Sequence, residues 1–496
     1  MDIKHLLERT VATPLFSFWM NKTELNKPTA GEQAARAGQW YAGACLLSAL
    51  IATSVADRLT SVLLVLSTFL FFIVCRYSKR YMMGDPGQVR FTFWLCLTGT
   101  CVFALVSSQN LLLFAAAWCA TSLSLHQLLQ FYPDRPGAIL AARKKFLISR
   151  LGDGALAAAL FLTHSVFGTW DFQRIFEAAE RYRLAGPEHL PAQVSWICGL
   201  LVFAALLKSA QFPFHSWLPD TMETPTPVSA LMHAGVINAG GILIIRLHPL
   251  ISLSETALSI LCLIGGFTAL FASTVMLTQA SVKRCLAFST VAQMGFMMLE
   301  CGLGAYHLAL VHLTAHALYK AHAFLSSGSV VLARPMAEQR AIRPAVIVSG
   351  LLAAAGISLT IASVLAISPL AEPVLIGIFT LALAQMLWSV WQGVDRIWQV
   401  PLGLGLGVGV TFAYFLLDRV ALLAVTPLKE EPGWIGLPIL AMFLFLAVGQ
   451  TQLPWISRTS FGKHLYVHAR NGFYFNTLAN RTTALLWPVK MAQERF

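Results

Sequence analysis

Lys208 lies inside a strongly apolar stretch that runs from Cys198 to Pro219. A charge near the centre of a bilayer costs roughly 3 kcal/mol or more. Five residues later, Pro213 removes a backbone donor and opens the helix, which hydrocarbon tolerates only where protein or water satisfies the freed groups. An ammonium beside a broken helix predicts a path for protons or cations. The alternative is a lysine near the end of a span that extends its ammonium to the membrane surface.

A carboxylate that could serve this lysine is Asp153, near the start of another apolar stretch. Arg150 stands three residues earlier, so the two side chains can pair on one helix face. One interpretation is an ion pair at the membrane surface. In the other, Asp153 alternates between Arg150 and Lys208 and thereby adjusts how tightly the lysine holds its proton.

After the helix break, Pro225 and Pro227 suit the start of an interrupted helix, and Thr224 or Thr226 could cap it. His233 follows about two turns into that span. A lone histidine within a membrane is often a hydrogen-bonded packing residue. Opposite a broken helix that carries a lysine, it is also a candidate proton relay.

The clearest periodic pattern is the row His312, His316 and Lys320, spaced at i, i+4 and i+8. These residues drift only about 40° per step and share one face over about 12 Å of helix. Two imidazoles and an ammonium in a row resemble a proton wire. A polar stripe that joins neighbouring helices and a metal site at His312 and His316 are the alternatives, although no carboxylate follows at a ligand position. Glu300, near the end of the preceding span, could face either this path or the surface.

The elements that must position these residues are membrane-spanning helices. The chain has 496 residues, of which 57% are hydrophobic and 12% charged, against about 25% charged in soluble domains. Apolar runs of about 20 residues predict an all-α polytopic bundle of about fourteen transmembrane helices, some of them broken. The runs centre near residues 48, 68, 99, 120, 157, 202, 237, 267, 294, 318, 355, 383, 412 and 442.

Charge predicts the orientation of this bundle. The net charge of +12 is explained by positively charged cytoplasmic loops, without nucleic acid. If the N-terminus is cytoplasmic, five basic segments share one side: Arg76 to Arg80, Ala142 to Lys145, Val282 to Arg284, Arg334 with Arg340 and Arg343, and the tail with Arg458, Lys463, Arg470 and Lys490. The opposite loops, Asp171 to Glu188 and Lys429 to Glu431, are acidic or mixed. We therefore expect both termini in the cytoplasm, with an N-terminal segment over 1–36, a transmembrane bundle over 37–455 and a basic tail over 456–496.

Other motifs suggest no chemistry in this chain. The nine cysteines form no CxxC pair, so neither a disulfide framework nor a thiolate metal site is indicated. The glycine-rich run Gly403 to Gly409 lies within an apolar stretch without a flanking βαβ pattern, and close helix packing explains it. With no P-loop and no catalytic serine or cysteine constellation, we expect an ion-conducting protein and no enzyme, with no cofactor and no metal of its own.

The polar positions resemble those of a known family, the antiporter-like, proton-conducting membrane subunits of respiratory complex I and of multisubunit cation/proton antiporters. The resemblance covers about residues 55–333. It implies that Lys208 is a protonatable switch, that His233 and the row from His312 to Lys320 belong to the proton path, and that Asp153 matches the acid of the family's RxGD motif. The matching stretches are YMMGDPGQVRF from Tyr81, NLLLFAAAW from Asn110, KKFLISRLGD from Lys144, LLKSAQFPFHSWLPDTMETPTPVSALMHAG from Leu206, KRCLAFSTVAQMGFM from Lys283 and HLTAHALYKAHAFLSSGSV from His312.

The chain also departs from that family. The glutamate that follows the family's tryptophan and pairs with the lysine is replaced, because this chain reads Trp118–Cys119. Asp153 is then the nearest candidate counter-charge. A lysine expected in a late broken helix is missing, since no lysine occurs from Arg343 to Gly409. These departures put a second half-channel in doubt.

The segment from Met222 to Gly241 and the tail from Leu465 to Arg481 look like the DabB-type subunit of bacterial inorganic-carbon transporters. That resemblance implies a subunit of the bacterial inner membrane that conducts protons or Na+ down their gradient. It also implies a large zinc-containing partner of DabA type on the cytoplasmic side, which resembles a β-carbonic anhydrase and hydrates CO2 to bicarbonate. The zinc would belong to the partner, and besides that partner we expect only membrane lipid. The alternatives are a proton-pumping subunit of a complex I-type quinone oxidoreductase and a Na+/H+ antiporter subunit.

Overall fold

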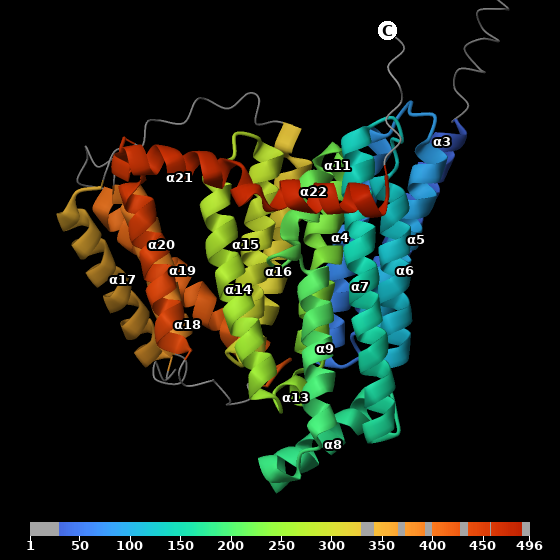
Figure 1. Ribbon diagram of the computed structural model, residues 1–496, viewed down its shortest axis with the longest axis horizontal. Coiled ribbons are helices and arrows are strands. Elements are labelled where there is room, and N and C mark those ends of the chain that lie inside the picture. Colours follow the sequence, from blue (N-terminus) through green and yellow to red (C-terminus); the bar gives the residue numbers. More distant parts are fainter. Residues whose placement is uncertain are drawn as a thin grey trace, which may run out of the picture.

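The computed structural model describes residues 29–328, 342–365, 373–391, 399–426, 435–456 and 458–488. Within them the chain is helical apart from turns and an isolated bridge between Asn110 and Asp171. Figure 1 shows the long helices standing side by side as a bundle. In chain order they are α3 (Ala30–Ala52), α4 (Arg58–Tyr81), α5 (Gln88–Ser107), α6 (Leu111–Leu129), α7 (Pro136–Phe167), α8 (Phe172–Ala185), η1 (Pro187–His189), α9 (Ala192–Lys208), η2 (Phe214–Ser216), α10 (Trp217–Asp220), η3 (Thr221–Glu223), α11 (Thr226–Ala234), η4 (Val236–Asn238), α12 (Ala239–Arg246), α13 (His248–Ile251), α14 (Glu255–Met276), α15 (Val282–Gly302), α16 (Tyr306–Leu325), α17 (Pro344–Val364), α18 (Pro373–Trp391), α19 (Gln399–Ala421), α20 (Gly436–Ile456), α21 (Ser460–Arg470), η6 (Gly472–Tyr474) and α22 (Phe475–Leu486).

The all-helical membrane bundle predicted from the sequence is confirmed. Ten of the described helical segments have the length and apolar composition needed to cross a membrane, and α9 and the Gly436–Gln452 part of α20 are shorter apolar segments. Each of the fourteen predicted centres falls inside one of the helices α3 to α20 or their breaks. The number of fourteen crossings stays a prediction, as do the three segment boundaries. Of the N-terminal segment 1–36, residues 1–28 lie outside the described part, and α3 begins at Ala30.

Two breaks interrupt the helices that carry Lys208 and His233. α9 ends at Lys208, and the chain then passes through Pro213 and three short helical turns before α11 starts. A second break at Gly235 separates α11 from α12. The predicted break at Pro213 is therefore present, because proline supplies no backbone donor and cannot continue the preceding helix. The break at Gly235 was not predicted from the sequence. The proposed cap is wrong, however, since α11 begins with Pro225 at its N-cap and has no side-chain cap.

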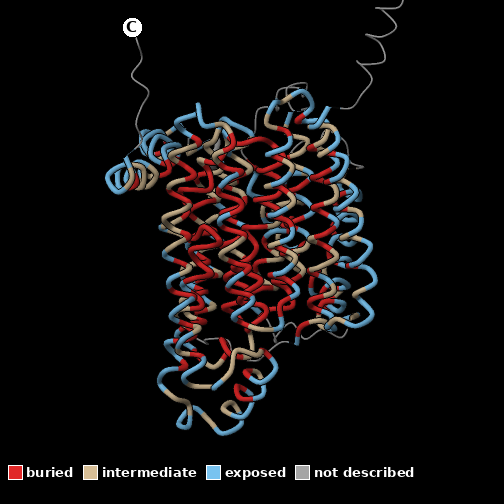
Figure 2. The backbone as a smooth tube through the Cα atoms, turned by 90° about the vertical axis from the view of Figure 1, so that its right-hand side faces the viewer, coloured by how far each residue is buried: buried red, intermediate tan, exposed pale blue. Residues whose placement is uncertain are grey.

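The two broken helices pack closely where their chains are interrupted. A Cβ atom on Gly240 would lie 2.3 Å from the Ser209 Oγ and 2.5 Å from the Ala205 carbonyl. Only glycine permits this approach of α12 to the end of α9. Both segments belong to the hydrophobic core, and Figure 2 shows that buried stretches gather in the middle of the bundle.

The last two helices, α21 and α22, lie across one end of the bundle, whereas α8 and α13 lie at the other (Figure 1). Arg143 near the start of α7 donates to the carbonyls of Trp487 and Pro488, and Gln279 donates to the Arg470 carbonyl. The predicted basic segments at Arg76 to Arg80, Ala142 to Lys145 and Val282 to Arg284 belong to this end. Arg334, Arg340, Lys429 to Glu431 and Lys490 lie outside the described residues.

At the opposite end, Arg246 anchors the end of α12 against α4. Its guanidinium donates to the Thr60 hydroxyl at 2.9 Å and lies 3.5 Å from the Asp57 carboxylate. Burial raises the pKa of the Asp57 carboxyl, but hydrogen bonds from Thr60 and the charge of Arg246 outweigh it and leave the pKa below its usual value. This contact holds the far end of the broken helix in place.

Candidate functional site

Lys208 is the last residue of α9, and its side chain is only 6% exposed. Its ammonium donates to the Ser122 hydroxyl at 2.7 Å and to the Trp118 carbonyl at 3.2 Å. It also lies 4.3 Å from the centre of the Trp118 ring, a cation–π distance. The ammonium therefore stays inside the bundle against α6 and does not extend to the surface.

Asp153 reaches the same tryptophan from α7. The Trp118 indole N–H donates to Asp153 Oδ1 at 3.0 Å, and Arg150 pairs with Asp153 Oδ2 at 2.5 Å. Trp118 thus stands between Asp153 and Lys208. Its indole N–H contacts the Asp153 carboxylate, and its carbonyl and ring contact the Lys208 ammonium. The predicted pair with Arg150 is present, whereas the alternation of Asp153 with Lys208 remains a prediction.

A second lysine, which the sequence analysis placed in a basic loop, joins this cluster. Lys145 belongs to α7, is only 3% exposed, and donates to the Ser122 carbonyl at 2.8 Å. Pro136 in the first turn of α7 is a typical helix start and would have predicted that Lys144 and Lys145 lie inside a helix. The interpretation of Ala142 to Lys145 as a surface loop is therefore wrong.

The charges of this cluster do not balance. Three cationic side chains, Lys145, Lys208 and Arg150, accompany the single carboxylate of Asp153. Two unit charges roughly 5 Å apart repel by about 3 kcal/mol at an effective dielectric constant of ~20. Both lysines donate to oxygens of Ser122, so their ammonium groups lie close together and repel each other. The arrangement therefore favours states in which only one of the two lysines is protonated.

A second cluster forms around His312 on α16. Its Nδ1 lies 2.8 Å from the Glu300 carboxylate, and its Nε2 lies 2.8 Å from the Gln293 side-chain oxygen. Glu300 is buried, so it faces the histidine row rather than the surface. Two oxygen acceptors suit a doubly protonated imidazole, and rotation of the Gln293 amide would suit the neutral ring. The pair can therefore hold a proton or release it.

The rest of the predicted row continues along α16. The rings of His312 and His316 have their centres 6.3 Å apart, and both nitrogens of the buried His316 lack a hydrogen-bond partner among the described residues. Lys320 is buried and donates to the Leu286 carbonyl at 3.0 Å. The three side chains thus follow one another on one side of α16, as the spacing predicts.

His233 meets this row from α11. The ring is fully buried and stacks on Phe324 of α16, with centres 4.2 Å apart. Its Nδ1 lies 3.1 Å from the Thr290 hydroxyl, and it interacts electrostatically with Lys320. Its Nε2 has no partner among the described residues. A relay histidine needs such a free nitrogen, since one nitrogen accepts while the other donates.

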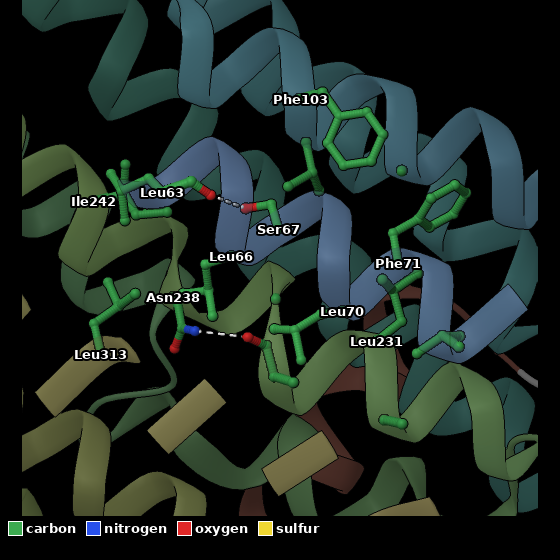
Figure 3. Close-up of a pocket in the computed structure, with 16 residues that line it drawn as sticks. Leu63, Leu66, Ser67, Leu70, Phe71, Phe103, Leu231, Asn238, Ile242 and Leu313 are labelled. Carbon is green, nitrogen blue, oxygen red and sulfur yellow. Dashed lines mark hydrogen bonds between the residues drawn. The ribbon is translucent and has the colours of Figure 1, made fainter. Parts of the chain in front are cut away.

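The two helix breaks lie between the Lys208 cluster and the histidine row. The Ser209 hydroxyl donates to the Ile237 carbonyl at 3.0 Å, which ties one break to the other. Gln211 Oε1 and Asn238 Oδ1 are buried there without partners among the described residues. Figure 3 shows Asn238 beside a small, mostly apolar cavity of about 30 Å³ that Leu66, Phe71 and Leu313 help to line. Buried polar atoms without a protein partner, such as Gln211 Oε1 and Asn238 Oδ1, are usual binding places for ordered water.

One ionisable pair escaped the sequence analysis. His307 Nε2 lies 3.0 Å from Asp418 Oδ1, and both side chains are buried. The pair joins α16 to α19 over more than a hundred residues of sequence, so no local pattern could have predicted it. Among the described residues, no group of three or more His, Cys, Asp or Glu side chains could hold a metal ion.

Comparison with known proteins identifies the architecture. Residues 108–404 match the family described as NADH:quinone oxidoreductase/Mrp antiporter, TM, and residues 50–92 match the NADH-ubiquinone oxidoreductase (complex I), chain 5 N-terminus. The fold is also similar to a chain of the Mrp complex from Dietzia sp. DQ12-45-1b, with a TM-score of 0.52 and 23% identity over 87% of this chain and 48% of that chain.

Two relatives are similar over most of the chain. The "Probable inorganic carbon transporter subunit DabB2" of Halothiobacillus neapolitanus is 40% identical over 477 residues, 92% of this chain and 84% of the relative. The corresponding DabB subunit of Hydrogenovibrio crunogenus is 36% identical over 441 residues, 88% of this chain and 83% of the relative. The chain therefore belongs to the family of antiporter-like membrane subunits shared by NADH:quinone oxidoreductases and Mrp antiporters, in which DabB inorganic carbon transporter subunits are similar to it along most of its length.

Proposed function

We propose that this chain is the energy-coupling membrane subunit of an inorganic carbon transporter. It conducts protons down their gradient and thereby drives a partner subunit that hydrates CO2 to bicarbonate. The observation that carries the proposal is a series of ionisable side chains inside the bundle. Lys145 and Lys208 at Ser122, His233 and Lys320 are buried, and the partly buried His312 ends the series. Ionisable residues inside a membrane protein are costly and are typical of ion and proton paths.

The proton moves through this series by charge repulsion and short transfers. A proton that arrives on Lys145 weakens the hold of Lys208 on its own, because the two ammonium groups share Ser122. The released proton passes by way of water at the breaks to His233. From there it reaches Lys320, His316 and the His312–Glu300 pair, where histidine both accepts and donates.

The side chains of this series favour protons over Na+. An ammonium has three donors and no acceptor, so a charged lysine cannot coordinate a cation. Sodium would need several oxygen ligands at one point, whereas the carboxylates of Asp153 and Glu300 belong to different clusters and are each already paired. The arrangement of charges within the described residues is thus better suited to proton transfer than to a cation cage.

The names of the relatives and the distribution of charge support our proposal for the partner and the location. We place the chain in the bacterial inner membrane with both termini in the cytoplasm, because the basic segments gather at the end that carries α21 and α22. A DabA-type, zinc-containing subunit that resembles a carbonic anhydrase would dock at this cytoplasmic end. The chemistry on CO2 would then belong to the partner, and this chain would supply the driving force.

The test is inorganic carbon uptake by the complete complex. Lys208→Ala is expressed together with the partner in cells that lack other CO2 uptake routes, and bicarbonate accumulation is measured. We expect uptake to fall to the level of cells without the transporter. Arg174→Ala, which removes an exposed arginine of α8 at the opposite end of the bundle, is the matched control and should keep full uptake. Unchanged uptake in the Lys208 variant would contradict the proposed path.

The likeness in fold to a chain of the Mrp complex supports a second candidate function, a Na+/H+ antiporter subunit. Vesicles that contain only this chain separate the two. Salt-dependent pH changes inside such vesicles favour the antiporter. Co-purification of the chain with quinone-reducing iron–sulfur subunits would instead favour a complex I relative, and a single large zinc protein would favour the inorganic carbon transporter.

A further inference from the structure

A polar cavity lies where the first helix break meets the C-terminal helices. Its volume is about 150 Å³, room for roughly five water molecules at ~30 Å³ each. Three separate parts of the chain form it: the break after Pro213, the start of α15, and the turn between α21 and α22. The lining residues used below are His215, Ser216, Asp220, Arg284, Arg470 and Asn476.

Two buried polar atoms of the break have no hydrogen-bond partner among the described residues. They are Nδ1 of His215, which is 2% exposed, and Oγ of Ser216, which is 3% exposed. Both residues line the cavity. Buried polar atoms are nearly always hydrogen-bonded in native proteins. These two therefore indicate a ligand or ordered water in the cavity.

The charge of the lining favours an anion. Asp220 is already neutralised, because the Lys144 ammonium lies 2.7 Å from its carboxylate and the Asn476 amide donates to it at 3.0 Å. The positive charges of Arg284 and Arg470 then remain in excess at the cavity. Guanidinium groups bind planar oxyanions with two parallel hydrogen bonds. A cation would meet an uncompensated positive field here.

The wall formed by the C-terminal helices has an unusual backbone. Gly472, Phe473 and Tyr474 follow one another with φ values of +58°, +51° and +65°, a region that residues other than glycine rarely adopt. Phe473 packs on Phe271, and Phe475 packs on Phe212 beside the break. These aromatic contacts hold the strained turn against the cavity, so its shape is imposed by tertiary packing.

We propose that this cavity binds a small monovalent oxyanion between Arg284 and Arg470, and that the ligand is bicarbonate. The identity of the anion rests on the proposed function, whereas the site itself rests on the cavity. Bicarbonate has four non-hydrogen atoms, fits the volume, accepts from both arginines and donates its hydroxyl proton to a histidine nitrogen. An anion held there connects α15, the helix break and the α21–α22 turn, next to the Lys144–Asp220 pair.

The test is binding to the purified full-length chain, measured as the shift of its thermal unfolding midpoint with millimolar bicarbonate at constant pH and ionic strength. We expect a saturable rise, and exchange broadening of the signal of carbon-13-labelled bicarbonate in solution NMR. Arg284→Gln with Arg470→Gln should weaken binding at least about tenfold. Ser216→Ala, which removes only a hydroxyl, should weaken it to a smaller extent. Arg80→Gln, an exposed arginine of α4, is the matched control.

A shift that does not saturate, that chloride reproduces, or that survives in the double arginine variant would overturn the site. Saturable binding of nitrate or formate without binding of bicarbonate would keep an anion site and overturn its assignment to inorganic carbon. The experiment needs no proton flux. Loss of the proposed conduction path at Lys208 therefore leaves this test unaffected, and the two proposals can fail separately.

Discussion

The helices α4 to α16 and the helices α17 to α20 differ sharply in what they bury. In the broken span Thr226–Arg246, 94% of an 18-residue apolar stretch is buried, and in α15 the corresponding share is 72%. In α17 and in α19 the corresponding share is 22%. Among the described residues of α17 to α20, Asp418 is the buried ionisable side chain, whereas the earlier helices bury His126, Lys144, Lys145, Lys208, His215, His233, Arg246, Glu300, His307, His316 and Lys320.

The two regions differ in how much free energy the burial of charged side chains costs. Each buried charge costs several kcal/mol unless it is paired and hydrogen-bonded. In the earlier helices, close packing around the polar side chains offsets this cost. The later helices present apolar faces such as Leu352 outward and contribute a single acid at their contact with α16. The sequence lacks the lysine expected in a late broken helix, and the helices of that region bury few polar side chains.

Among the variants that compare the two regions, the largest effect is expected from Lys145, a buried lysine that the sequence analysis assigned to a basic loop. Lys145→Met should lower inorganic carbon uptake at least about tenfold, equivalent to ~1.4 kcal/mol in the barrier, because Lys208 loses the neighbour that displaces its proton. The measurement is uptake per amount of protein in the membrane. Arg174→Met, an exposed position of α8 at the opposite end of the bundle, serves as the control. Full uptake in Lys145→Met would mean that the lysine only fills space at Ser122.

A smaller effect is expected at the other end of the path. Glu300→Gln should lower uptake by roughly fivefold, about 1 kcal/mol, since the uncharged amide no longer stabilises a protonated His312. The dependence of uptake on pH should change as well, because the carboxylate that contacts His312 Nδ1 is removed. A variant with lower protein levels but the normal pH profile would assign Glu300 a purely structural role.

Asp418 tests whether the later helices take part at all. Asp418→Asn should lower uptake by only about twofold, ~0.4 kcal/mol, because it touches the path through His307 alone. Thr411→Val, a buried change on the same helix, is the control. A loss as large as that of Lys145→Met would break the distinction between the two regions and place a second half of the path in α19.

No effect on specific uptake is expected from changes in the apolar part of the later helices. Trp388→Ala should destabilise the folded protein by about 3–5 kcal/mol, since a fully buried ring is removed. Leu352→Ala, on an exposed face, should change stability by less than about 0.5 kcal/mol. Thermal unfolding of the purified variants measures both. Uptake per folded molecule should stay normal in each, and a selective loss of uptake would show that these helices do more than pack.

Local sequence patterns were sufficient for several parts of the site. The spacing of His312, His316 and Lys320 predicted a shared face because the helical repeat is fixed by backbone geometry. Pro213 predicted the break beside Lys208. The spacing of three residues between Arg150 and Asp153 predicted their ion pair, because each of these effects acts within one or two turns. Where the local signal was misread, as for Lys145, the helix start at Pro136 was the overlooked feature.

By itself the sequence determined that the chain is a bundle of membrane helices, that ionisable residues such as Lys208 and Lys320 lie within its apolar spans, and that a helix breaks at Pro213, since composition, periodicity and proline act locally. Only the tertiary structure decided which of these residues meet. Trp118 separates Lys208 from Asp153, Ser122 joins two lysines from different helices, Glu300 turns inward to His312, and Asp418 reaches His307. The physical reason is that these contacts join helices far apart in sequence, and their distances depend on how whole helices pack rather than on any local preference.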